Sequence, residues 1–384
     1  MIPELRGVHA EKLLRIIAST SSSTLTQSEY VYLTVALNRA SKAASRPRSG
    51  EWEDTVGEWL RNHAGRMPVR QATLTMNALA RAGAGDSCGW IGESLKALLQ
   101  HTGDLVAQDL SLALNAAAKV LADENKRPAG GVPAEVLSLC EEVLSRALPR
   151  LAKDLAPQGF ANVLHACAKL KIRPSALIVV EKFCISPLLR GSDSSNPLLG
   201  MNRQELSLLI YSLSRLFPPS NGSVRAVFEF AAPTVTSNES LKGMQDGIIK
   251  RLSYFTAPVV DKMSIAELAN VGKFFVGCGA PDYSFLMECS RRLRCIPEHQ
   301  LRSAQNLSLL MGIYAKALVR DAPLVCGVLL AAFMSCKNPD PPSVTRTLLA
   351  ISRLDLVRNI DKSHRRNLLR LARRSLASSD QHSL

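Results

Sequence analysis

The sequence predicts an all-α fold built from repeated helix pairs, and three observations support this prediction. One pattern of apolar and small residues recurs along the chain, and most copies carry a basic residue eleven positions after their start. Most copies begin about forty residues apart, which is the length of two helices and their turns in a solenoid repeat. No segment alternates apolar and polar residues for long enough to indicate a sheet. The eight copies begin at Ser28, Arg70, Gln108, Gln158, Gln204, Ala266, Gln305 and Pro342.

Within each copy, the pattern fits a helix with one buried side. At about 100° per residue, positions two, six and nine face the same way and are mostly apolar, while the flanking positions eight and ten are mostly small. Positions zero, four, seven and eleven face the opposite way and are mostly polar. Position four is nevertheless leucine in four copies, so we expect half-buried helices in the inner layer of the array. These leucines are Leu74, Leu112, Leu208 and Leu309.

Each copy is followed by a segment that fits a second helix. Segment 133–148 has a proline in its first turn and early acidic residues, which both favour a helix N-terminus. The long interval after Gln204 holds an additional segment, 241–255, that fits a third helix or an extra half-repeat. Other second helices are expected over 175–184, 224–232, 282–295 and 322–336, with turns at 126–131, 191–197 and 338–342.

These elements predict one elongated repeat domain over residues 1–360, followed by a basic capping helix and tail over 361–384. We expect the repeats to form a right-handed superhelix. The hydrophobic content of 46% provides apolar surface for burial, and the aromatic content of 5% fits close stacking on small residues. The longest apolar run, 324–334, is shorter than the about 20 residues that a membrane span needs, so we predict no such span.

The cysteines and histidines do not suggest a metal site, a cofactor or a disulfide framework. The nine cysteines are scattered without a C-x-x-C pair, and the seven histidines are far apart in the sequence. Several cysteines, including Cys140 and Cys167, occupy apolar helix positions, which is typical of buried thiols in a reducing compartment. We therefore predict no bound metal and no cofactor.

One short segment matches an enzyme motif. Residues 85–89 read G-x-S-x-G, in which Ser87 would be the nucleophile of a hydrolase. That motif requires a strand before it, whereas a helical segment over 70–82 precedes it here, so its glycines fit a helix end and a turn. We find no phosphate-binding loop and no H-E-x-x-H motif. We predict no catalytic activity, and a hydrolase using Ser87 is the least favoured alternative.

The net charge of +14 at pH 7 favours a polyanionic partner. When the helices stack, the base at position eleven falls into one row, and such a row can follow a phosphate backbone. A base near a helix C-terminus also complements the helix dipole, which explains any single one of these residues about equally well. The row comprises Arg39, Arg81, Lys119, Lys169, Arg215, Lys316 and Arg353.

Position seven of the copies varies in a way that suggests contacts to RNA bases. It is Asn77, Asn115, His165, Tyr211 and Lys273 in successive copies from the second to the sixth. Different hydrogen-bonding and stacking side chains at one repeated place are what base recognition requires. A polar face without a ligand has the same appearance. We select His165 and Tyr211 as candidate base contacts.

The C-terminal segment is a second basic element. Residues 346–374 include nine Lys or Arg residues and two Asp residues. Leucines on one side of this segment can cap the last repeat and leave the arginines for solvent or RNA. A membrane-surface helix has a similar composition, but the apolar side here is short and lacks Trp and Phe. The candidate contacts are Arg365, Arg366, Arg370, Arg373 and Arg374, and a smaller cluster of Arg291, Arg292 and Arg294 has the same two interpretations.

Two segments resemble a known repeat. PQGFANVLHACAKLKI (157–172) and NRQELSLLIYSLSRLF (202–217) resemble the Q-E-L-x-x-x-L-x-A-x-A-K-L helix of octotricopeptide-repeat, heptatricopeptide-repeat and FAST-kinase-like proteins. The resemblance implies an α-solenoid that acts on RNA in mitochondria or plastids. The chain departs from these families because it lacks a recognisable RAP domain at its C-terminus and because its repeat spacing is irregular. The irregular spacing favours a solenoid fixed in one assembly over a modular reader of RNA.

We therefore expect a non-catalytic RNA-binding protein of an organelle, and specifically a structural or assembly component of the mitochondrial ribosome. Its partners would be ribosomal or organellar messenger RNA and ribonucleoprotein subunits. The mitochondrial location, with plastids as the alternative, depends on the resemblance, because residues 1–18 are a poor transit peptide. The alternative function is a scaffold that holds a protein on its concave face, for example during assembly of a membrane or respiratory complex.

Overall fold

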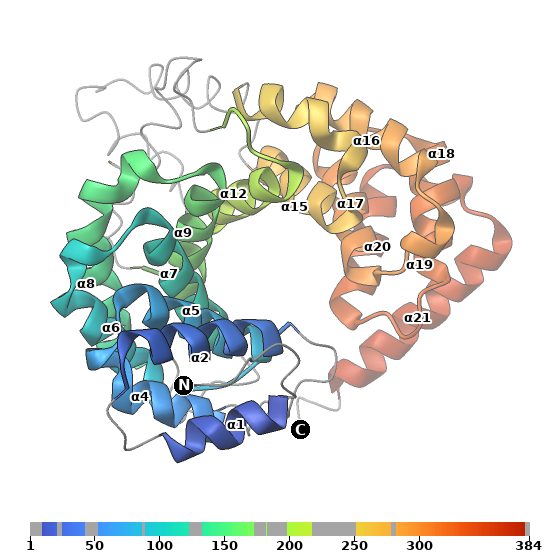
Figure 1. The fold of residues 1–384 in the computed structure, drawn as a ribbon. Helices are drawn as coiled ribbons and strands as arrows, with labels where there is room; N and C mark the ends of the chain where they lie inside the picture. The colour runs from blue at the N-terminus through green and yellow to red at the C-terminus, as the bar shows by residue number, and fades with distance from the viewer. Residues whose placement is uncertain are drawn as a thin grey trace. The chain divides into compact units, whose positions relative to one another are not determined.

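A computed structural model gives the fold of the chain (Figure 1). Every regular element in the described part of the chain is helical, and no strand is found there, which confirms the predicted all-α fold. The chain divides into two compact units, residues 1–200 and 201–384. The structure describes residues 10–20, 25–42, 53–86, 89–122, 133–172, 182, 198–216, 251–277 and 282–380.

Four inner helices of the first unit begin one residue before the first four predicted starts. Each packs against the next one along the chain, and Figure 1 shows them as neighbours. Positions two, six and nine are buried in all four copies, as the pattern predicts. Leu74 and Leu112 at position four are half-buried. The four helices are α2 (Gln27–Ala40), α5 (Val69–Ala82), α7 (Ala107–Leu121) and α9 (Pro157–Leu170).

Side-chain bonds show that these inner helices run in the same direction. Arg81, in the last turn of α5, donates to Oδ1 of Asn38 near the end of α2 over 2.8 Å. Arg70, in the first turn of α5, pairs with Asp109 in the first turn of α7 over 2.6 Å. Equivalent ends of α2, α5 and α7 are therefore adjacent, and residues at the same repeat position are brought side by side.

A second layer of helices packs outside the inner row. It contains α4 (Glu58–His63), α6 (Trp90–Gln100) and α8 (Ala134–Leu151), which pack on one another in that order. Helix α8 confirms the helix predicted over 133–148. Its Arg150 donates to the carbonyl oxygens of Thr102 and Leu105, which lie just before α7. Because α9 begins soon after α8, this bond also places the N-terminal ends of α7 and α9 near each other.

The remaining elements of the first unit lie at its edge or link its helices. Helix α1 (Ala10–Ser19) packs against α2 and against the π-helical turn η1 (Glu53–Gly57). Three 3-10 turns, η2 (Ala64–Arg66), η3 (Thr102–Asp104) and η5 (Ala152–Asp154), precede α5, α7 and α9. The turns at 126–131 and 191–197 lie outside the described residues, and so does the helix predicted over 175–184 except for residue 182.

The second unit has inner helices at the last four predicted starts. They pack in chain order, α12 on α15, α15 on α17 and α17 on α20. Gly272 at position six of α15 faces Ile313 at position eight of α17, where an added Cβ would lie 3.1 Å from Cδ1 of the isoleucine. The absence of a side chain at Gly272 therefore lets Ile313 pack directly against α15. The four helices are α12 (Arg203–Leu216), α15 (Ile265–Gly277), α17 (Ala304–Lys316) and α20 (Pro341–Arg353).

Outer helices of the second unit match the prediction where they are described. Helix α16 (Tyr283–Cys295) confirms the helix predicted over 282–295. The helix predicted over 322–336 is present as α18 (Ala322–Leu324), the π-helical η11 (Val325–Leu330) and α19 (Ala331–Met334). Of the segment 241–255, only the end is described, and it is helical and leads into η9 (Ala257–Lys262). The segment 224–232 lies outside the described residues.

The C-terminal helix α21 (Lys362–Asp380) packs against α20 and α19 and so caps the last copy. Leu368 is buried in this contact, whereas Leu369 is 52% exposed. The 3-10 turns η10 (Glu298–Gln300) and η12 (Val357–Asn359) connect neighbouring helices. Each helix in the described ranges is too short or too polar to span a bilayer.

The cysteines differ in exposure, which partly matches the expectation of buried thiols. Cys140, Cys167 and Cys289 are buried, while Cys295 is exposed. Burial raises the pKa of the Cys140 thiol to about 12, and it also raises the pKa of Cys289. Thiols with such pKa values are protonated and unreactive at neutral pH.

The pairing of Arg70 with Asp109 predicts a measurable loss of stability on substitution. The Asp109 side chain is 3% exposed and accepts bonds from both Arg70 and the Thr73 hydroxyl. We expect Asp109→Asn to lower the free energy of unfolding by about 1–3 kcal/mol, because a buried charge-assisted bond is weakened. Urea denaturation of the variant measures this change. Asp104→Asn is the control, since Asp104 is exposed, and an equal loss in both variants would contradict the role of the buried pair.

Candidate nucleic-acid interface

The predicted row of cations in the first unit lies at the C-terminal ends of the inner helices. Arg39, Arg81, Lys119 and Lys169 each occupy the last turn of their helix. Arg39 and Lys119 are exposed, and Arg81 and Lys169 are half-buried. Because the four helices are adjacent and run in the same direction, these side chains share one end of the inner layer.

Arg81 also contributes to the structure of the protein. Its Nη1 donates to Asn38 over 2.8 Å and approaches Oγ of Ser41 at 3.4 Å. These bonds use part of its donor capacity and tie α5 to α2. The charge of the guanidinium remains in the row, but its geometry is set by α2.

His165 lies one turn before Lys169 on α9 and is half-buried. Burial lowers the pKa of His165 to about 4, and the positive charge of Lys169 contributes to this shift. The imidazole is therefore neutral at neutral pH. A neutral imidazole offers one hydrogen-bond donor and one acceptor, which are the groups needed to contact a base edge.

The same arrangement of ring and cation occurs on α12 in the second unit. Tyr211 is half-buried, and Arg215 follows one turn later and is exposed. An aromatic ring next to a cation can stack on a base while the cation contacts the adjacent phosphate. Lys316 and Arg353 are exposed in the last turns of α17 and α20.

The second unit also gathers two cations that the position-eleven row does not include. Lys273 is at position seven of α15, the copy in which Gly277 replaces the terminal base. Arg346 is at position four of α20 and donates to Oγ of Ser308 on α17 over 2.8 Å. The Lys273 side chain is exposed, but partial desolvation lowers its pKa, and the charges of Arg215, Arg346 and Lys316 lower it further. Lys273 and Arg346 occupy repeat positions seven and four, which face away from the buried side of their helices. Their repeat positions were therefore the signal in the sequence that could have identified them as candidate contacts.

The candidate arginines of α21 differ in their roles. Arg365 donates to the carbonyl oxygens of Val357 over 2.8 Å and Ile360 over 3.5 Å, so it anchors the start of α21 to the preceding turn. The other candidates are exposed on the helix surface. They are Arg366, Arg370, Arg373 and Arg374.

The smaller cluster on α16 is held largely by ion pairs within the protein. Arg291 pairs with Asp261 over 2.5 Å and with Glu288 over 3.0 Å. Arg294 pairs with Asp321 over 2.6 Å, and the Asp321 side chain is 16% exposed. These contacts connect α16 to its neighbours, so we assign Arg291 and Arg294 a structural role.

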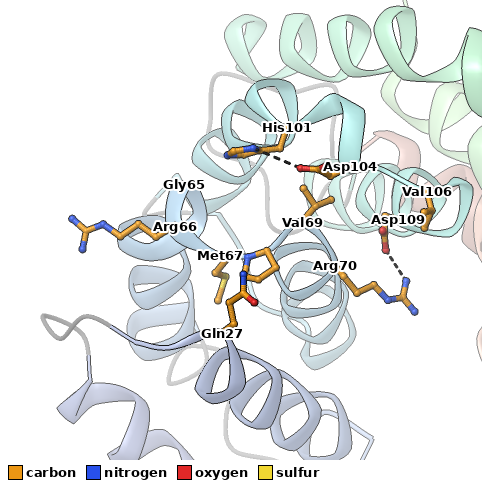
Figure 2. A pocket seen from close by; sticks show the side chains of 11 residues that line it. Gln27, Gly65, Arg66, Met67, Val69, Arg70, His101, Asp104, Val106 and Asp109 are labelled. Carbon is orange, nitrogen blue, oxygen red and sulfur yellow. Dashed lines mark hydrogen bonds and ion pairs between the residues drawn. The ribbon is translucent and has the colours of Figure 1, made fainter.

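A pocket of about 600 Å³ lies at the opposite, N-terminal ends of the first unit's inner helices (Figure 2). Its lining includes Arg70 paired with Asp109, and His101 lies 3.9 Å from Asp104. Figure 2 shows Arg66 extending away from these pairs. The opposite charges in the lining face one another, and no serine or cysteine contributes to it.

The G-x-S-x-G segment follows a helix, as the sequence predicts. Helix α5 ends at Ala82, and Gly83 adopts a left-handed conformation with φ 84°. Gly89, with φ 74°, directly precedes α6. The strand that a nucleophile elbow requires is therefore replaced by a helix, and Ser87 itself lies outside the described residues.

Comparisons with known proteins do not assign a family or a function to this arrangement of residues. No family model matches the chain, and no curated protein is significantly similar to it. Within the described ranges, no group of three or more His, Cys, Asp or Glu side chains is arranged to hold a metal ion.

The lowered pKa of His165 predicts that the stability of the folded protein depends on pH. Its pKa is about 4 in the folded protein and 6.5 ordinarily, so unfolding takes up a proton between these values. The free energy of unfolding should therefore fall as pH is lowered from about 6.5 to about 4. We expect His165→Gln to flatten this dependence relative to the wild type in urea denaturation at several pH values. His101→Gln, at an exposed histidine, should retain it, and an unchanged slope in His165→Gln would contradict the assignment.

Proposed function

We propose that this protein is a non-catalytic RNA-binding α-solenoid. The observation that supports this most directly is the row of cations at one end of adjacent, parallel inner helices. Neighbouring packed helices are about 8–10 Å apart, which is within the reach of Lys and Arg side chains toward successive phosphates. The neutral His165 and the Tyr211 ring lie one turn from members of the row, where bases of a bound strand would be contacted.

We propose further that the helix pairs form eight repeats of a right-handed superhelix. The eight inner helices at the predicted starts support this proposal. The resemblance of 157–172 and 202–217 to organellar repeat helices supports a location in mitochondria. The irregular spacing of the copies favours a fixed place in one assembly, so we propose a structural or assembly component of the mitochondrial ribosome that contacts ribosomal RNA.

The first experiment tests RNA binding by the row of the first unit. Lys119→Gln with Lys169→Gln should lower the slope of log affinity against log salt by about 0.7 for each lost phosphate contact with single-stranded RNA. The control is Arg146→Gln with Lys153→Gln, which removes two exposed charges from α8 and from the turn before α9. Fluorescence anisotropy over a salt series measures both slopes.

A slope that falls equally in both pairs of variants would reflect net charge alone and would contradict binding along the row. RNA affinity that none of the variants changes would favour the scaffold that holds a protein. The melting temperature should be similar in all variants, because Lys119, Arg146 and Lys153 are exposed and Lys169 is only half-buried.

The second experiment tests the exposed arginines of α21. The variant Arg366→Gln, Arg370→Gln, Arg373→Gln, Arg374→Gln keeps the buried Leu368 and the anchoring Arg365, so α21 should still cap the last copy. We expect it to bind RNA and ribosomal particles more weakly at moderate salt in a sedimentation assay. Anionic liposomes should compete poorly with RNA for the wild type. Strong liposome binding together with undiminished particle association would assign this helix to a membrane surface.

A further inference from the structure

The inner helices of the second unit place four cations on one surface. Ser308, Gly312 and Lys316 are spaced four residues apart and so follow one face of α17. Arg346 of α20 crosses this face, because its Nη1 donates to Ser308 over 2.8 Å. Lys273 of α15 lies within electrostatic reach of both helices and of Arg215 on α12.

The position of Arg346 depends on a missing side chain. A Cβ at Gly312 would lie 3.3 Å from both Cγ and Cδ of Arg346, so the aliphatic part of the arginine occupies the space that a larger residue would fill. Position seven is a larger residue in the preceding inner copies, such as Tyr211 and Lys273. Glycine at this one position therefore allows a cation from α20 to reach across α17.

The carboxylates of these helices do not balance the four charges. Helices α17 and α20 contain no acidic residue. Glu205 of α12 and Glu267 of α15 accept bonds from backbone amides at the N-terminal ends of their helices. Among the described residues, none of Arg215, Lys273 and Lys316 has a carboxylate partner within ion-pair distance.

The charge of Lys273 makes this arrangement costly without a ligand. Its side chain is exposed, but partial desolvation and the charges of Arg215, Arg346 and Lys316 together lower its pKa, so its charged form is less stable than that of an isolated lysine. A group of like charges without a carboxylate gains stability when an anion binds between them. The surface thus has the properties of a site that is completed by an anion.

We propose that Arg215, Lys273, Lys316 and Arg346 form one binding site for consecutive phosphate groups of a single RNA strand. This proposal rests on the RNA-binding function proposed above and assigns that function a specific set of contacts. The four residues come from four successive inner helices at about 8–10 Å spacing, which is an extended arrangement. A strand of several nucleotides can contact all four, whereas one isolated phosphate group cannot.

The test uses the full chain and a single-stranded RNA oligonucleotide. Lys273→Gln and Arg346→Gln should each lower the salt slope by about 0.7, which corresponds to about fivefold weaker binding at 0.1 M salt. Arg346→Lys should retain the slope, because it keeps the charge. The matched controls are Arg302→Gln and Lys337→Gln, which remove exposed cations just before α17 and just after α19.

Thermal melting separates a binding role from a structural one. Without RNA, Lys273→Gln should melt at a temperature at least as high as the wild type, because it removes one charge from a group of neighbouring like charges. The stabilisation that RNA gives to the wild type should be reduced in this variant. A lower melting temperature of the free variant, with RNA stabilisation unchanged, would overturn the site.

The remaining outcomes distinguish a failure of this site from a failure of the proposed RNA-binding function. If Lys119→Gln with Lys169→Gln lowers the salt slope while Lys273→Gln and Arg346→Gln match their controls, the site is wrong and RNA binding stands. If the wild type does not bind RNA at low salt, the proposed function fails and the site fails with it. If tripolyphosphate binds in a Lys273-dependent manner but does not compete with RNA, the site takes a free polyphosphate, which also overturns the proposal.

Discussion

The parallel packing of adjacent inner helices is the constraint on which the candidate interface depends. Small residues at positions eight and ten let these helices approach closely, and the bonds of Arg70 with Asp109 and of Arg81 with Asn38 fix their relative height. Once the register is fixed, each repeat position is placed beside its counterpart on the next helix. A basic residue that is unremarkable in one helix thereby becomes a member of a row, and a buried apolar position becomes part of a continuous core.

The two ends of the inner helices differ in their electrostatics. At the N-terminal ends, carboxylates such as Asp109, Glu205 and Glu267 accept bonds from an arginine or from backbone amides, so charges there are balanced locally. At the C-terminal ends, bases interact favourably with the helix dipole. Around Lys273, however, the charges of Arg215, Arg346 and Lys316 repel the charge of the lysine. The protein retains unfavourable charge at the end where the proposed ligand binds, which is a common compromise at functional surfaces.

The sequence predicted the inner helices to within one residue, because their signal is local periodicity and every copy repeats it. It predicted the buried side of each helix for the same reason. It did not predict that Arg346 would reach across α17, because that contact depends on a glycine in a different helix about thirty residues away. Nor did the sequence distinguish Arg365 and Arg294, whose side chains bond to other parts of the protein, from arginines such as Arg370 that have no such bond among the described residues. Side-chain partners depend on which helices become neighbours, and composition alone does not contain that information.

Gly312 has a consequence for how such an array could recognise a nucleotide sequence. If each repeat read its nucleotide with its own side chains, the preference of the array could be composed repeat by repeat as a modular code. At Gly312, however, the side chain over α17 comes from α20, so the chemical group presented there is determined by two repeats together. If the proposed site binds RNA, its smallest unit of recognition at this place is a pair of adjacent helices. Exchanging one repeat for another would alter the specificity of its neighbour as well.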